Sequence, residues 1–327
     1  MINHKIIDVH AHFITEKYRA KLIDAGYEKP DGMPRIPDWN KEEALKMMDR
    51  HNISTAMLSI SSPGVHFGED AQARSLARLV NEEGMEIVNA HPDRFGLFAS
   101  LPLPDIEGSL DEIDYAVNTL HVDGFVLETN FHGVYLGDDK LLPIFSKLDT
   151  YGSILFIHPT SPYCSCNGHA HQYQQLSYPN PMMEFIFDTT RSVINMILMG
   201  VTKKFKNIKI IIPHAGAALP VIADRVAGLT PILGLENPIT EGDIFNELQS
   251  FYYDLAGAPL PRLLPALRTF AKDTHLLYGS DYPFTAENLL QKFLQKIKDS
   301  DLSSDIQEDI FQNNAINLFK RLNSNIV

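Results

Sequence analysis

Five residues of metal-binding type stand where predicted strands end. His10 and His12 form a His-x-His pair, His158 and His214 each end an apolar run, and Asp281 follows a further one. Side chains two residues apart in an extended segment point to the same side, so one strand can offer both imidazoles of the pair to a single ion. Imidazole and carboxylate groups suit zinc, and a catalytic zinc keeps one position open for water or substrate. The pattern predicts one shared metal site, although a lone histidine at a strand end more often caps it through a hydrogen bond.

These five residues need a fold that gathers the ends of several strands. Short β-rich runs alternate with amphipathic helical patterns along the chain, which is typical of βα units on a parallel sheet. The predicted strands are Lys5–His10, Ala56–Ile60, Phe95–Ala99, Gly124–Leu127, Ile154–His158, Ile208–Ile212, Phe251–Asp254 and His275–Gly279. The predicted helices are Lys41–Arg50, Ala71–Ala90, Ile106–Leu120, Lys140–Tyr151, Met182–Phe205, Ala217–Gly228, Pro261–Lys272 and Glu287–Lys298. Eight of each favour an α/β fold of the closed (β/α)8 TIM-barrel type, with an open doubly wound sheet as the alternative.

The chain is expected to form a single domain over residues 1–327, because no change of composition marks a linker. Two long segments, Thr15–Trp39 after the first strand and Thr160–Pro181 after the fifth, are predicted as inserted loops. Both leave the carboxyl ends of strands, where barrel enzymes build their sites. Residues Ser303–Asn323 are expected to form a C-terminal helical tail packed outside the ring.

The second inserted loop carries a cluster that resembles another metal site. It contains Cys164, Cys166, His169 and His171, which are suitable ligand types, but the spacing is cramped and lacks the usual CxxC knuckle. A mobile loop over the barrel mouth is the preferred interpretation, with a structural zinc as the alternative. Two cysteines are also too few for a disulfide framework and favour a reducing compartment.

The overall charge limits the classes of partner. The chain has 28 Lys and Arg residues against 41 Asp and Glu, a net charge of −13. An acidic surface argues against nucleic acid and anionic membranes as partners. No apolar run approaches the roughly 20 residues that span a bilayer, and the start of the chain does not resemble a signal peptide. A cytoplasmic protein is expected.

Four motifs together resemble a known family. Asp8-Val9-His10-Ala11-His12, Phe156-Ile157-His158-Pro159, Pro213-His214-Ala215-Gly216 and Gly279-Ser280-Asp281-Tyr282-Pro283 are similar to motifs of the amidohydrolase superfamily. Their order and spacing most resemble its decarboxylase branch, which includes aminocarboxymuconate-semialdehyde decarboxylase and the 6-methylsalicylate decarboxylases. The resemblance implies that His10, His12, His158 and Asp281 hold the metal, and that His214 and Asp281 are catalytic.

The same resemblance suggests residues that bind the substrate. Arg225 lies in the helix where family members place an arginine, which in the aminocarboxymuconate enzyme reaches into the neighbouring subunit's pocket, so a homodimer is implied. The alternative for Arg225 is a surface salt bridge. Arg35, ahead of Trp39, is an offset counterpart of a second substrate-binding arginine. His66 after the second strand and Phe284 beside Asp281 are further candidates for lining the pocket.

The expected activity is a metal-dependent, non-oxidative decarboxylation of a small hydroxylated aromatic or related unsaturated carboxylic acid. One divalent metal, zinc or alternatively manganese, would orient the acid and offset its charge, and Asp281 or His214 would protonate the ring carbon. No organic cofactor is expected. Zinc-bound water has a pKa of about 7, so the same ligands would also support hydrolysis of a lactone or cyclic amide. Ala217 occupies the position where the dihydroxybenzoate decarboxylases carry a glutamate, which leaves the substrate open. A barrel that only senses ligands is a third interpretation, which the intact residue set disfavours.

Overall fold

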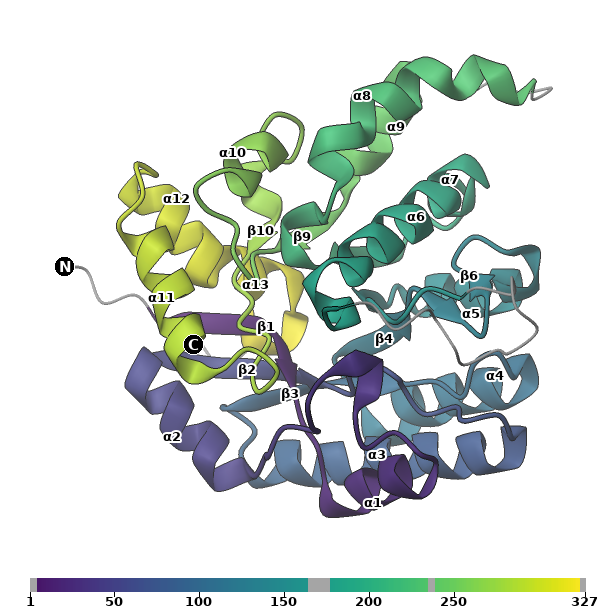
Figure 1. Ribbon diagram of the computed structural model, residues 1–327, viewed down its shortest axis with the longest axis vertical. Coiled ribbons are helices and arrows are strands. Elements are labelled where there is room, and N and C mark those ends of the chain that lie inside the picture. The colour runs from purple at the N-terminus through teal and green to yellow at the C-terminus, as the bar shows by residue number, and fades with distance from the viewer. Residues whose placement is uncertain (1–4, 164–176, 235–238, 324–327) are drawn as a thin grey trace.

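The computed structural model describes residues 5–163, 177–234 and 239–323 (Figure 1). Within them, eight parallel strands pair in the order in which they follow one another along the chain. They are β1 (Ile6–His12), β2 (Ile53–Ser59), β3 (Phe95–Ser100), β4 (Gly124–Glu128), β7 (Ile154–His158), β8 (Lys209–Ile212), β9 (Tyr252–Asp254) and β10 (Leu276–Leu277). The ring closes because the amide of Val9 donates to the Tyr278 carbonyl at 2.9 Å and that of His12 to the Tyr282 carbonyl at 2.7 Å. The expected (β/α)8 TIM barrel is confirmed.

Helices surround the strands and follow the predicted pattern with three differences. The helices of the ring are α2 (Lys41–His51), α3 (Asp70–Ala90), α4 (Ile106–Tyr115), α5 (Leu142–Tyr151), α6 (Glu184–Leu198), α7 (Val201–Lys204), α8 (Leu219–Leu229), α9 (Glu241–Ser250), α10 (Leu263–Leu267) and α11 (Glu287–Lys298). The single helix expected over Met182–Phe205 is interrupted at Gly200, whose φ of +71° takes the chain out of the right-handed helix. The helix expected over Pro261–Lys272 shortens to α10, and α9 was not expected.

The two inserted segments differ in content. The first is not simply a loop, because it contains α1 (Glu16–Asp24), whose first turn is capped by the Thr15 hydroxyl accepting from the amide of Tyr18. The second falls largely on residues 164–176, so the cluster of Cys164, Cys166, His169 and His171 lies outside the described residues. A short antiparallel hairpin of β5 (Asn130–Phe131) and β6 (Val134–Tyr135) follows β4 and was not expected.

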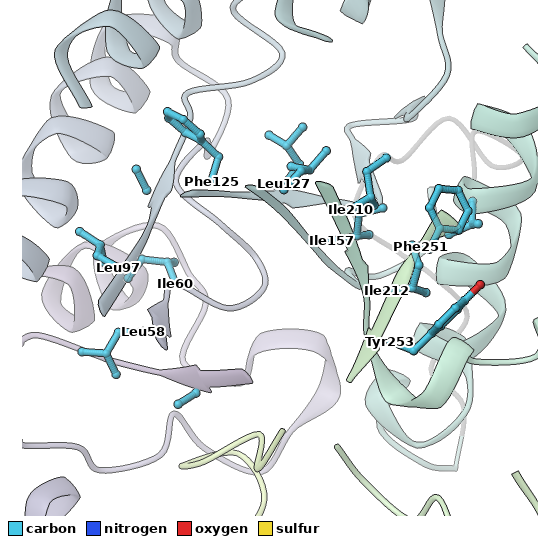
Figure 2. Packing of buried hydrophobic residues seen from close by; sticks show 14 of the residues in the cluster. Leu58, Ile60, Leu97, Phe125, Leu127, Ile157, Ile210, Ile212, Phe251 and Tyr253 are labelled. Carbon is cyan, nitrogen blue, oxygen red and sulfur yellow. The ribbon is translucent and has the colours of Figure 1, made fainter. Parts of the chain in front are cut away.

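Buried apolar side chains form two clusters on opposite sides of the strands. The larger cluster lies between the strands and the helices, and includes Leu97, Leu127 and Ile157, which point from the strands toward the surrounding helices (Figure 2). The smaller one fills the barrel interior below the histidines, with Phe98 and Phe156 stacked at 5.4 Å. Alternation along each strand therefore separates an outer helix-facing layer from an inner core.

The C-terminal tail was expected outside the ring, but part of it closes the barrel from below. It forms α12 (Ser304–Glu308), a π-helical turn (Asp309–Asn313), α13 (Asn314–Leu318) and α14 (Lys320–Asn323). Leu318 and Phe319 belong to the inner cluster. Arg321 donates to Asp123 at 2.8 Å and to the carbonyl of Pro92 at 2.6 Å, both of which precede strands. The tail thus covers the amino ends of the strands, opposite the predicted site. In the described part of the chain, no helix combines the length and apolar character needed to cross a membrane.

Candidate metal centre

The four predicted metal ligands meet at the carboxyl end of the barrel. His10 and His12 end β1, His158 ends β7, and Asp281 follows β10. One ligand atom from each of these residues lies within 4.8 Å of the others. The three imidazoles are buried, whereas the Asp281 side chain is 20% exposed, so the group opens to the mouth of the barrel on the side of the carboxylate.

Hydrogen bonds to the remote nitrogens decide which atoms of β1 face the centre. Nδ1 of His10 lies 3.0 Å from Oδ2 of Asp254, and Nδ1 of His12 lies 3.3 Å from the carbonyl oxygen of Ser59. The Ser59 hydroxyl lies 3.0 Å from the same nitrogen of His12 and donates its own hydrogen to the Ala11 carbonyl. With acceptors at both positions, each Nδ1 carries the hydrogen and each Nε2 presents a lone pair. A carboxylate or carbonyl behind a histidine in this way is the usual support of a metal-bound imidazole.

In the tautomers that these partners favour, the lone pairs of the two Nε2 atoms and of Asp281 face one another. The two Nε2 atoms of His10 and His12 are 3.1 Å apart, and Oδ1 of Asp281 lies 3.5 Å and 3.3 Å from them. Three acceptors in a buried space repel one another unless a positive charge sits among them. Two imidazole nitrogens and a carboxylate oxygen, with His158 beside them, fit a divalent cation.

The electrostatics of the centre also favour a positive charge. Burial opposes the charged form of His10, yet Asp254 and Asp281 raise the pKa of that imidazole to about 10. Burial likewise opposes the charge of Asp281, but the neighbouring imidazoles of His10, His12 and His214 hold its pKa well below the ordinary value. For His158, burial and the neighbouring imidazoles hold the pKa well below its ordinary value, so the ring is neutral and can offer a nitrogen lone pair to a metal.

Asp8 holds the two sides of the centre in register. Its Oδ1 accepts from the amide of His10 at 3.1 Å and from the amide of Ser280 at 2.9 Å. His10 lies in the strand that carries two of the ligands, and Ser280 directly precedes the ligand Asp281. Asp281 itself has a φ of +59°, and its amide donates to the His10 carbonyl at 2.7 Å. Burial raises the pKa of Asp8 to about 7 in spite of these hydrogen bonds.

His214 stands beside the centre without belonging to the ligand group. Its Nε2 is 3.9 Å from Oδ2 of Asp281, and its backbone amide donates to Oδ1 of Asp254 at 3.2 Å. Nδ1 of His214 is buried and has no hydrogen-bond partner among the described residues. Because His214 and Ala215 both have positive φ, the chain turns sharply after β8 and presents the imidazole to the mouth.

Aromatic side chains border the centre. Phe284 packs edge-on against His12, with ring centroids 5.4 Å apart, and Phe185 of α6 faces His158 at 6.4 Å. Phe156 closes the floor 4.8 Å from His10. Flat apolar walls beside a polar centre suit a small aromatic ligand.

The other predicted substrate-binding residues are not brought to the centre by any contact within the described chain. Arg225 is exposed on α8. Arg35 is 73% exposed and donates to Asp38 at 3.1 Å, as a surface ion pair does. His66 is buried, but its ring nitrogens contact Asp70 at 2.9 Å and His132 at 3.0 Å. Roles in substrate binding stay predictions for these three residues.

Sequence reasoning missed the residues that support the ligands. Asp254 and Ser59 hold His10 and His12, and Glu128 lies beside His158. Asp254, Ser59 and Glu128 are the last residues of β9, β2 and β4. Their position at the carboxyl ends of predicted strands was the one available signal.

The chain matches the amidohydrolase family over residues 7–321. It belongs to the amidohydrolase family. This amidohydrolase is 32% identical to a 6-methylsalicylic acid decarboxylase of Penicillium expansum, over 97% of this chain and 96% of the relative.

Two solved structures extend the comparison. A crystal structure of an amidohydrolase II has a TM-score of 0.88 and 33% identity, covering 96% of this chain and 99% of that one. A dihydroxybenzoic acid decarboxylase from Polaromonas, with bound manganese and the inhibitor 2-nitroresorcinol, has a TM-score of 0.80 at 23% identity, covering 97% of each chain. The resemblance seen in the four motifs is confirmed, and the histidine and aspartate group of this amidohydrolase is a site for a divalent metal.

Proposed function

We propose that this amidohydrolase is a metal-dependent, non-oxidative decarboxylase of a small hydroxylated aromatic or related unsaturated carboxylic acid. The observation that carries the proposal is the buried cluster of His10 Nε2, His12 Nε2 and Asp281 Oδ1 between aromatic walls. The relative named 6-methylsalicylic acid decarboxylase, which this chain matches over 97% of its length, supports the same reaction.

The residues around the centre have distinct roles in such a reaction. His10, His12, His158 and Asp281 would hold a divalent ion, which would supply Lewis-acid binding of the substrate's hydroxyl and carboxylate oxygens. His214 and Asp281 form the acid–base pair, because their side chains lie 3.9 Å apart at the open side of the centre. One of them protonates the ring carbon that bears the carboxylate. The carbon–carboxylate bond then breaks, its electron pair restores the ring, and CO₂ leaves.

Zinc is the proposed metal, with manganese as the alternative. Three imidazoles and one carboxylate are borderline ligands that zinc binds readily, and manganese tolerates them as well. Metal analysis of purified protein, followed by activity after reloading with each ion, checks this assignment.

A homodimer is proposed from the outer face of α8. Val221 is 78% exposed, Leu229 42% and Ile232, in the turn that follows, 77%. With Arg225 they recur at helical spacing, so they share one face of a segment that projects from the ring (Figure 1). Apolar side chains gathered on one exposed face are typical of an interface. In this arrangement Arg225 reaches the substrate of the neighbouring subunit.

Mixing two inactive variants tests whether Arg225 acts across the interface. Arg225→Ala lacks the arginine, and His214→Asn lacks the proposed acid. A mixed dimer regains one complete site if Arg225 acts on the neighbour, so activity is expected to return on subunit exchange. No return of activity while mixed dimers form would contradict this role.

Residues 1–327 are proposed to fold as one domain in each subunit.

Product analysis in D₂O tests the function itself. Metal-loaded enzyme is incubated with a panel of ortho-hydroxybenzoates and lactones, and the products are analysed by mass spectrometry. Loss of CO₂ with one deuterium on the carbon that carried the carboxylate is expected. Addition of water to a lactone, with the acids untouched, would overturn the proposal and identify a hydrolase. His158→Ala serves as the control, and is expected to lose both metal and activity.

A further inference from the structure

Glu128 is a buried carboxylic acid that belongs neither to the ligand group nor to the acid–base pair. It ends β4, and its neighbour across the sheet is His158 at the end of β7. The Glu128 side chain is 8% exposed, and Oε2 has no hydrogen-bond partner among the described residues. A buried polar atom without a partner is destabilising, so core packing does not account for a glutamate here.

The unpartnered oxygen faces the one metal-site imidazole of the described chain that lacks support. Oε2 of Glu128 lies 3.5 Å from Nδ1 of His158, and this Nδ1 is also buried without a hydrogen bond. By contrast, the remote nitrogens of the other two histidines already face acceptors, the Asp254 carboxylate for His10 and the Ser59 carbonyl for His12. Glu128 occupies the corresponding position behind the third imidazole.

The loop after β2 passes close to the Glu128 carboxyl group. A Cβ atom added to Gly64, which follows β2, would lie 3.4 Å from Oε1 and 3.5 Å from Cγ of Glu128. The hydroxyl of Tyr18 donates to the Gly64 carbonyl at 2.7 Å and fixes this loop against the glutamate. The loop after β2 therefore borders the Glu128 carboxyl group.

We propose that Glu128 is a positioning residue for the metal, which accepts the Nδ1 hydrogen of His158 and so presents Nε2 as the ligand atom. This inference rests on the proposed metal site. Binding of a cation at Nε2 makes the Nδ1 hydrogen a stronger donor, which shortens the contact to a true hydrogen bond. All three histidines are then oriented by an acceptor behind the ring, in spite of their origin on two different strands.

Metal affinity of the metal-free protein tests this role directly. Zn²⁺ and Co²⁺ are titrated in competition with a chelator of known affinity into wild type, Glu128→Ala and Glu128→Gln. Loss of an outer partner of a metal-bound histidine typically weakens binding about 10- to 100-fold. Glu128→Ala is expected to show such a loss and an altered Co²⁺ absorption spectrum. Glu128→Gln, which keeps an acceptor oxygen but cannot ionise, is expected to lie between alanine and wild type.

A matched control separates positioning from general effects of a buried glutamate. Glu112 is also buried, but it pairs with Arg78 and Asn81 away from the centre, so Glu112→Gln is expected to bind metal as wild type does. If Glu128→Ala does not fold, Glu128→Gln decides alone. Affinities within twofold of wild type and an unchanged Co²⁺ spectrum would overturn the role of Glu128. Failure of wild type to bind metal would instead overturn the proposed function.

Discussion

Asp254 connects the residue that binds metal with the residue proposed to move protons. Its carboxylate faces Nδ1 of His10 through Oδ2 and accepts from the amides of His214 and Ala256 through Oδ1. Burial opposes its charge, but the interaction with His10 keeps the pKa of Asp254 below the ordinary value. The group is therefore a carboxylate that fixes both the tautomer of His10 and the backbone of His214.

Replacing Asp254 with asparagine is expected to weaken metal binding. The amide can donate to Nδ1 of His10, which would move the hydrogen to Nε2 and remove a ligand lone pair. The expected loss of affinity is about 10- to 100-fold, measured by chelator competition. Asp273→Asn, which alters a surface ion pair with Arg268, is the control and should leave metal binding unchanged. Equal affinities for both variants would argue against this support of His10.

His214→Asn is expected to separate chemistry from metal binding. Because His214 is not among the four grouped ligands, the variant should retain one metal ion per chain by elemental analysis. Loss of a general acid or base typically lowers kcat by about 10²- to 10⁴-fold, and we expect a fall in that range. Loss of the metal together with activity would contradict the assignment of His214 as an acid–base residue.

At the scale of elements, the strands were predictable because each is a short apolar run between turn signals. All eight lie within a few residues of their predicted bounds. The β5–β6 hairpin was missed because each of its strands has two residues, too few to show a period. The five site residues were visible because they pair or recur at strand ends. Asp254 and Glu128 were not, since a lone carboxylate at a strand end has no spacing that marks it.

The start of α4 shows how a single capping residue links two helices. Asp105 accepts from the amide of Gly108 at 3.1 Å, and Arg74 of α3 donates to it at 2.5 Å. Burial raises the pKa of Asp105, but the hydrogen bonds from Arg74 and Gly108 outweigh this effect and leave it below the ordinary value. A carboxyl with a lowered pKa in the folded state stabilises the fold above its unfolded pKa, and this contribution is lost as pH falls through the folded pKa.

Asp105→Ala is therefore expected to lower the free energy of unfolding at pH 7 by about 1–2 kcal/mol, because it removes an N-cap together with an ion pair. The deficit relative to wild type should begin to shrink as the pH falls below the unfolded pKa of about 4, and should be lost as the pH falls through the lower pKa of folded Asp105. Urea unfolding of both proteins between pH 3 and pH 7 measures the difference. A deficit that stayed constant over this range would show that the charge of Asp105 contributes nothing.

For the molecule as a whole, the two ends of the barrel have separate tasks. The carboxyl end carries the metal ligands, whereas the amino end is closed by the tail through Leu318, Phe319 and Arg321. Sequence patterns predicted the helices of the tail but not their place, because an amphipathic pattern does not specify the surface that the apolar face will cover. The proposed homodimer depends on the same limit, since the exposed apolar face of α8 does not by itself specify the surface that covers it.

Phe319→Ala is expected to destabilise the barrel without altering the centre at its other end. Phe319 is 1% exposed and packs 5.9 Å from the ring of Phe98, so its loss leaves a cavity at the base of the core. Such truncations typically cost about 3–5 kcal/mol, which urea unfolding can measure. Leu289→Ala, at a position 43% exposed, is the control and should change stability little. Metal affinity measured well below the unfolding transition should match wild type, because Phe98 and Phe156 separate the tail from the histidines. A weakened metal site in folded Phe319→Ala protein would mean that the inner core transmits strain from one end of the barrel to the other.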